Sequence, residues 1–135
     1  MKLLLRSFVF LALTALSGCR ATNDDATKNE LEYLYQEWKL SIEESAVDKL
    51  VFRTTNYVFP TSDYRLTYSF TQSAAVVTVK SGTKTVNVTG SYTTEVSGNS
   101  LEKLSVTYKA PNQSQTTTSY DVQIIAQDVL IVKPL

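Results

Sequence analysis

Apolar and polar residues alternate in short runs along most of the chain. Between Tyr64 and Phe70, for example, every second residue is aromatic or aliphatic and the residues between them are polar. Such alternation is typical of a β-strand with one buried face and one solvated face. The runs cover residues 38–42, 50–53, 64–70, 75–79, 86–88, 92–96, 104–108, 120–124 and 130–132.

Turn-forming residues separate these runs. They include Ser81-Gly82-Thr83, Ser97-Gly98-Asn99-Ser100, Ala110-Pro111-Asn112 and Gln127-Asp128. The pattern predicts an all-β domain of about eight strands over residues 30–135, antiparallel and in up-and-down order. A closed barrel leaves no free sheet edge and is the expected architecture, with a sandwich of the same strands as the alternative.

One helical turn is expected before the first strand. Leu31, Leu34 and Trp38 are three and four residues apart, which is helical spacing, and Asn29 is a suitable N-cap. The pattern predicts no longer helix in the domain.

The first part of the chain has a different composition. Lys2 and Arg6 precede an apolar stretch that ends near Leu16, and small residues follow it. This layout predicts a secretory signal peptide over residues 1–18. The alternative, a membrane-spanning helix, requires about 20 apolar residues, more than this stretch contains.

Leu16-Ser17-Gly18-Cys19 resembles the lipobox of bacterial lipoproteins. The resemblance implies cleavage by signal peptidase II between Gly18 and Cys19, and lipidation of Cys19, the one cysteine in the chain. The alternative is an ordinary signal peptide that happens to contain a cysteine. Residues 19–29 are mostly small and polar and are expected to form a flexible tether. Arg20, following the lipidated residue, favours the outer membrane of a Gram-negative cell envelope.

Leu34-Tyr35-Gln36-Glu37-Trp38-Lys39-Leu40 resembles the start of a lipocalin-like domain, although Gln36 stands where that motif has glycine. Gly90-Ser91-Tyr92 and residues 128–132 resemble a middle strand and the closing strand. The resemblance implies that Trp38 closes one end of the barrel and that the other end is open. It places the loops 44–49 and 56–63 at the open end.

Six aromatic residues are therefore candidates for ligand binding or for lining the barrel. They are Trp38, Tyr57, Phe59, Tyr64, Tyr68 and Phe70. Tyr57 and Phe59 lie in a loop that is more apolar than a connection requires. The alternative for all six is ordinary packing, because an eight-stranded barrel is only just wide enough to contain a ligand.

The sequence lacks the residues of common catalytic and metal sites. It contains no histidine, and its single thiol is assigned to lipid. Glu43 and Glu44 are adjacent at a predicted strand end, where they would point to opposite faces. Asp24 and Asp25 lie in the tether. We expect no enzyme activity, no cofactor and no metal site. Charges balance, at 13 basic and 13 acidic residues, which argues against nucleic-acid binding.

Two functions fit these observations. The first is an outer-membrane-anchored, lipocalin-like lipoprotein that binds a small apolar or amphipathic ligand in the cell envelope. The second is a non-catalytic interaction or inhibitor lipoprotein that binds a protein or polysaccharide through its outer face or loops. Abundant Ser, Thr, Asn and Tyr residues motivate the second.

Overall fold

The structure is a computed structural model that describes residues 29–135. The predicted signal peptide, its Gly18–Cys19 cleavage site, the lipidation of Cys19 and the tether up to residue 28 lie outside the described residues. The predicted domain, residues 30–135, lies within them.

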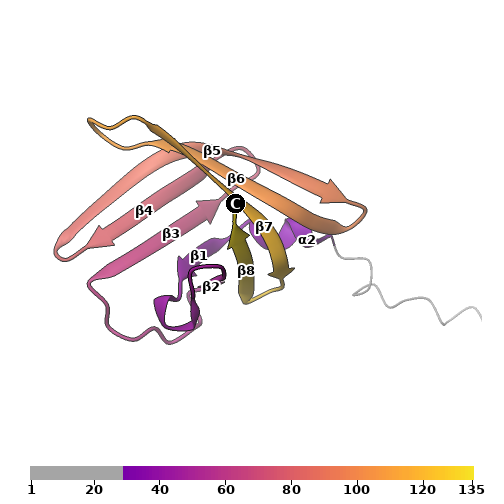
Figure 1. Ribbon diagram of the computed structural model, residues 1–135, viewed down its shortest axis with the longest axis horizontal. Helices are drawn as coiled ribbons and strands as arrows, with labels where there is room; N and C mark the ends of the chain where they lie inside the picture. The colour runs from indigo at the N-terminus through magenta and orange to yellow at the C-terminus, as the bar shows by residue number, and fades with distance from the viewer. Residues whose placement is uncertain (1–28) are drawn as a thin grey trace, which may run out of the picture.

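Eight antiparallel strands form a closed barrel, which confirms the predicted fold class (Figure 1). A short helix, α2 (Glu30–Leu34), precedes the strands, and one 3₁₀ turn, η2 (Ile42–Glu44), follows the first of them. The strands are β1 (Glu37–Leu40), β2 (Leu50–Arg53), β3 (Tyr64–Phe70), β4 (Ala75–Ser81), β5 (Lys84–Ser97), β6 (Ser100–Lys109), β7 (Gln115–Ile125) and β8 (Val129–Pro134).

The two ends of the barrel differ in what covers them. We call the end with α2 and the turns after β3, β5 and β7 the helix end, and the opposite end the hairpin end. The hairpin end carries the connections after β1, β4 and β6, together with the chain end after β8. In Figure 1 the tips of the β4–β5 and β6–β7 hairpins lie well apart at this end.

The runs 86–88 and 92–96 belong to one long strand, β5, so the barrel has eight strands. The part of β5 before Ser91 pairs with β4, from Ser81↔Lys84 to Ala75↔Gly90. The part from Ser91 onward pairs with β6. β5 therefore changes its neighbour at Gly90.

Gly90 makes this change possible because it has no side chain. A Cβ at this position would lie 2.3 Å from the carbonyl oxygen of Thr107 on β6, well inside van der Waals contact. The two backbones approach closely here and separate beyond this point, which is a common role of glycine at a bend in a barrel strand.

The strand order departs from the expected up-and-down order at one connection. β1 lies between β2 and β3, and β2 pairs with β8, so that β2 and β3 run in the same direction. A connection between two such strands must return along the whole barrel, because β2 ends at the helix end and β3 starts at the hairpin end. Residues 54–63 form this return, which explains why the connection is long.

The return runs along the outside of the barrel. Phe52 and Leu66 face inward, so their sequence neighbours Arg53 and Arg65 lie on the outer face of the barrel. The guanidinium carbon of Arg53 lies 5.3 Å from the ring centre of Tyr57, and that of Arg65 lies 4.4 Å from the ring centre of Phe59. Phe59 and Pro60 contact Arg65 near the start of β3, so the loop 56–63 reaches the hairpin end with its second half, in contrast to the expected placement of the whole loop there.

The first strand is shorter than expected, because Ile42 leaves the strand pattern and belongs to η2. Glu43 and Glu44 consequently lie on a 3₁₀ turn and not at a strand end. Glu44 accepts two hydrogen bonds from Arg53, at 3.0 and 2.7 Å. These bonds lower the pKa of the Glu44 carboxyl, so that it is held ionised as a partner of Arg53.

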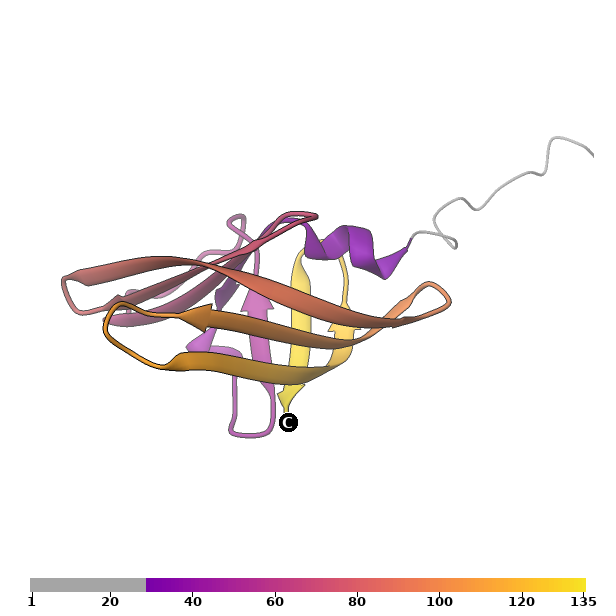
Figure 2. The ribbon, with the colours of Figure 1, turned by 90° about the horizontal axis from the view of Figure 1, so that it is seen from above.

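The predicted helical turn and its cap are confirmed. Asn29 accepts a hydrogen bond from the Leu31 amide at 3.0 Å, and the turn is α2. The helix is attached to the β5–β6 turn by two hydrogen bonds, from the Glu30 amide to the Asn99 carbonyl and from the Leu101 amide to the Glu30 carboxylate. Figure 2 shows α2 beside the helix end.

Replacement of Gly90 by alanine tests the close approach between β5 and β6. The new methyl group would meet a backbone oxygen that cannot move alone, so we expect Gly90→Ala to lower the free energy of unfolding by about 1–3 kcal/mol. Ser91→Ala, at the next and exposed position, is the matched control and should change it by less than about 0.5 kcal/mol. Urea unfolding measures the free energy of unfolding of both variants. Equal effects would contradict the close approach of the β5 and β6 backbones at Gly90.

Candidate functional site

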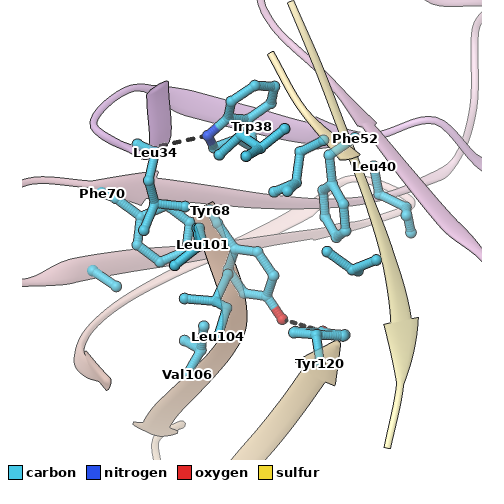
Figure 3. Close-up of a cluster of buried hydrophobic side chains, with 14 of the residues drawn as sticks. Leu34, Trp38, Leu40, Phe52, Tyr68, Phe70, Leu101, Leu104, Val106 and Tyr120 are labelled. Carbon is cyan, nitrogen blue, oxygen red and sulfur yellow. Dashed lines mark hydrogen bonds between the residues drawn. The ribbon is translucent and has the colours of Figure 1, made fainter. Parts of the chain in front are cut away.

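The helix end of the barrel is closed by Trp38. Its side chain is fully buried, and its indole N–H donates a hydrogen bond to the Leu34 carbonyl at the end of α2, at 3.1 Å (Figure 3). The side chain of Gln36 donates to the carbonyls of Tyr33 and Gln127, at 2.8 and 3.1 Å. Gln36, which stands where the resembling motif has glycine, therefore links α2 to the β7–β8 turn by hydrogen bonds.

Side chains fill the middle of the barrel. Phe52 stacks on Tyr68 with ring centres 5.5 Å apart, and Tyr68 also contacts the rings of Phe70 and Tyr120. Aliphatic side chains from the other strands, including Leu104, pack around these rings. None of the clefts described below is lined by any of these aromatic residues.

Two buried tyrosine hydroxyls meet inside this core. The Tyr68 and Tyr120 oxygens lie 2.8 Å apart, and Figure 3 shows the pair between β3 and β7. One hydroxyl donates to the other, so the pair retains one hydrogen for a further acceptor. The two hydroxyls satisfy each other in a site where an unpaired polar group would be destabilising.

Burial raises the pKa of both hydroxyls, and the nearby Tyr108 and Tyr64 raise them further. The hydrogen bond acts differently on the two groups, raising the pKa of Tyr68 and lowering that of Tyr120. Both therefore remain neutral at neutral pH. Because the folded state holds these protons more strongly than the unfolded state, their contribution to stability is lost as the pH rises above about 10.

An apolar cleft of about 190 Å³ lies at the hairpin end. It occupies the space between the β4–β5 hairpin and the start of the β6–β7 turn, beyond the point at which β5 leaves β6. The cleft is lined by Val77, Val79, Val86, Val88, Tyr108, Ala110 and Gln113.

The cleft continues the inner face of the barrel. Val77 faces Val88 and Val79 faces Val86 across the β4–β5 ladder, on the same side as the buried Ala75. Val77 is buried in the core, whereas Val86 is 40% exposed. The apolar wall thus runs from the filled core outward into solvent, as the wall of a binding cleft does.

The structure separates the six predicted site residues into three groups. Trp38, Tyr68 and Phe70 belong to the filled core. Tyr64 faces inward at the hairpin end and is 44% exposed, near the mouth of the barrel. Tyr57 and Phe59 lie outside the wall, edge to face with each other at 4.9 Å and against the two arginines. Ligand contact by any of the six stays a prediction.

Sequence reasoning missed the residues that form the cleft. The pattern predicts an ordinary strand for Val86 and Val88 and places Tyr108 at the end of another. Their alternation correctly indicates one apolar face, but nothing in the pattern shows that this face lacks cover near the tip of the hairpin. The one local signal is Gly90, a strand glycine beside the valines.

Two other grooves are polar. One, of about 410 Å³ at the helix end, is lined by Gln36, Thr54, Thr55, Asn56, Gln127 and Asp128. The other, of about 290 Å³, lies on the outer face of β1, β3 and β4 and includes Lys39, Arg65 and Lys80.

Within residues 29–135, no group of three or more His, Cys, Asp or Glu side chains is arranged to hold a metal ion. No helix in this part of the chain is long and apolar enough to cross a membrane.

The fold and site together define a closed eight-stranded antiparallel barrel with a filled core and an apolar cleft at one end. Comparison of the chain with protein-family models, with curated proteins and with solved structures finds no match.

The tyrosine pair can be tested by a double-mutant cycle. Tyr68→Phe or Tyr120→Phe alone leaves one buried hydroxyl without its partner, and each should lower the free energy of unfolding by about 1–3 kcal/mol. The double variant removes both hydroxyls and should cost less than the sum, with a coupling of about 1 kcal/mol. Additive effects in denaturant unfolding would show that the hydroxyls do not interact.

Proposed function

We propose that this protein binds a small apolar or amphipathic molecule in the cleft at the hairpin end. The observation that carries the proposal is the valine wall of Val77, Val79, Val86 and Val88, which continues the inner face of the barrel into solvent. The core itself is filled, so the ligand enters only as far as the cleft extends.

The size and chemistry of the cleft limit the ligand. A volume of about 190 Å³ is below the usual range of about 300–1,000 Å³ for ligand pockets, so the cleft takes one part of a molecule, such as a short hydrocarbon segment or a ring. The Tyr108 ring and the Gln113 side chain supply the polar and aromatic contacts at its edge. The rest of the ligand lies at the mouth, near Tyr64.

We also propose that the protein is a lipoprotein anchored in the cell envelope through Cys19. The proposal rests on the Leu16-Ser17-Gly18-Cys19 motif and on the position of α2. The chain enters the domain at the helix end, so an anchor at Cys19 leaves the cleft at the far end of the barrel. Localisation in the outer membrane of a Gram-negative cell follows from Arg20 as part of the same proposal.

A neutral apolar fluorescent probe, N-phenyl-1-naphthylamine, tests the cleft. We expect saturable binding to the full-length protein, and a loss of affinity of about tenfold or more in Val86→Asp, because a carboxylate in the cleft must be desolvated when the probe binds. Val76→Asp is the matched control, since Val76 is a valine of similar exposure, 36% against 40%, on the outer face of the same hairpin. Fluorescence titration measures all three proteins.

Equal loss of affinity in the two variants would overturn the assignment of the cleft. Native mass spectrometry of the protein purified from its own cells gives an independent test. A bound mass of a few hundred daltons is expected, and it should be absent from Val86→Asp. A protein without added mass that also fails to bind the probe would refute the proposed function.

Substitution of Cys19 tests the anchor. Cys19→Ser removes the thiol that would carry the lipid, so we expect the protein to move from the membrane fraction to the soluble fraction after cell lysis. Ser17→Ala, which leaves the thiol, should stay with the membranes. Sedimentation and immunoblotting measure the distribution, and a Cys19→Ser protein that still sediments with membranes would contradict lipidation.

A further inference from the structure

The β5 strand has a free edge beside the cleft. Its pairing with β6 ends at Ser91↔Thr107, whereas its pairing with β4 continues to Lys84. Residues 84–89 therefore have a neighbour on one side only. A second hollow, of about 340 Å³, follows this fork on the outer side of the sheet and is lined by residues that include Thr89, Thr107 and Lys109.

The turn between β4 and β5 shows which backbone groups point to the free side. Ser81 and Lys84 flank the two turn residues, and Gly82 has a positive φ of 59°, so this is a two-residue hairpin turn that closes on a hydrogen-bonded pair. Hydrogen-bonded and non-hydrogen-bonded pairs alternate along an antiparallel ladder. The amide and carbonyl groups of Thr85, Asn87 and Thr89 consequently point away from β4 and toward the fork.

The two faces of this edge differ in chemistry. Val86 and Val88 present apolar side chains to the inner cleft. Thr85, Asn87 and Thr89 present polar side chains to the outer face, where Asn87 accepts a hydrogen bond from Thr78 at 2.7 Å. A strand added at this edge would therefore place every second side chain on valine and the others in solvent.

The two hairpin segments beside the fork carry charge of one sign. The hairpin segments 71–94 and 104–120 contain Lys80, Lys84 and Lys109 and no aspartate or glutamate. None of these three lysines lies within 4 Å of a carboxylate in the described part of the chain. Two copies of this edge would bring six lysines together, so charge disfavours self-pairing and favours an acidic partner.

We propose that the free edge of β5 binds an extended acidic peptide by β-strand addition, with alternate apolar side chains of the peptide on Val86 and Val88. The backbone groups of Thr85, Asn87 and Thr89 supply the hydrogen bonds, and the valines and lysines supply the preference for sequence. This site does not require a small ligand, because the hydrogen bonds lie on the edge and outside the cleft.

A synthetic peptide of alternating valine and glutamate is the probe. The proposed pairing is antiparallel, and the glutamates of the peptide oppose Thr85, Asn87 and Thr89. The glutamate amides therefore point to β5, and the valine amides point away. N-methylation of the glutamate amides should abolish binding, whereas N-methylation of the valine amides should be tolerated. A peptide of alternating valine and lysine should not bind. Isothermal titration calorimetry on the full-length protein measures each affinity.

Substitutions in the protein test the backbone groups of β5 that form the same hydrogen bonds. Asn87→Pro removes one edge amide that makes no bond to β4 and should abolish peptide binding. Asn87→Ala is the matched control, since it loses the side-chain bond to Thr78 and keeps the amide. The double variant Lys84→Gln/Lys109→Gln should weaken binding about tenfold, while Lys103→Gln, outside the fork, should have little effect.

Hydrogen–deuterium exchange locates the bound peptide. Protection is expected in residues 84–89 and not in residues 91–97, which already pair with β6. Equal binding of the two N-methylated peptides, or unchanged affinity in Asn87→Pro, would overturn the proposal. The methylated peptides decide the question even if Asn87→Pro fails to fold. Asn87 does not line the apolar cleft, so loss of peptide binding in Asn87→Pro with retained probe binding would separate this site from the small-ligand cleft.

Discussion

The shape of the barrel depends on the close approach of Gly90 to Thr107. At this point the β5 and β6 backbones are too close for any side chain, and beyond it the two strands separate. β5 can then pair with two strands in succession, with β4 through its first part and with β6 through its second part. β5 therefore has one strand neighbour at each end, β4 toward the hairpin end and β6 toward the helix end, and the hairpin end splits into two arms (Figure 1).

A filled core and an open cleft follow from this single change of partner. In the middle of the barrel, the inner faces of the strands approach one another closely enough for Trp38, Phe52 and Tyr68 to fill the space between them. Where β5 has left β6, the inner face of the β4–β5 hairpin faces Tyr108, Ala110 and Gln113 across the cleft, and Val86 remains partly exposed. The strands keep one alternating pattern throughout, so the pattern itself does not distinguish the buried part from the open part.

This explains why the fold could be predicted from the sequence better than the site. Alternation depends on which side of a strand faces inward, and it correctly predicted an antiparallel barrel. It did not predict the β2–β3 return, because strand order depends on long-range pairing that no local pattern records. Ile42 fits the alternation of the preceding strand and yet belongs to η2, where the Glu44–Arg53 hydrogen bonds hold the turn. The sequence around Trp38 contains a motif that predicts its place at one end of the barrel, whereas the cleft residues belong to no motif.

The free edge of β5 would normally favour aggregation, since unpaired backbone groups beside exposed valines invite another strand. The lysines on both arms oppose this, because they keep a second copy of the same edge at a distance. A charge that excludes a copy of the chain also attracts a partner of opposite sign, and no acidic residue on either arm offsets it. Protection from self-association and selection of an acidic strand thus arise from the same three side chains. The edge keeps its hydrogen-bonding groups exposed, and its lysines form no ion pair in the described part of the chain. Such an edge is suited to bind another chain.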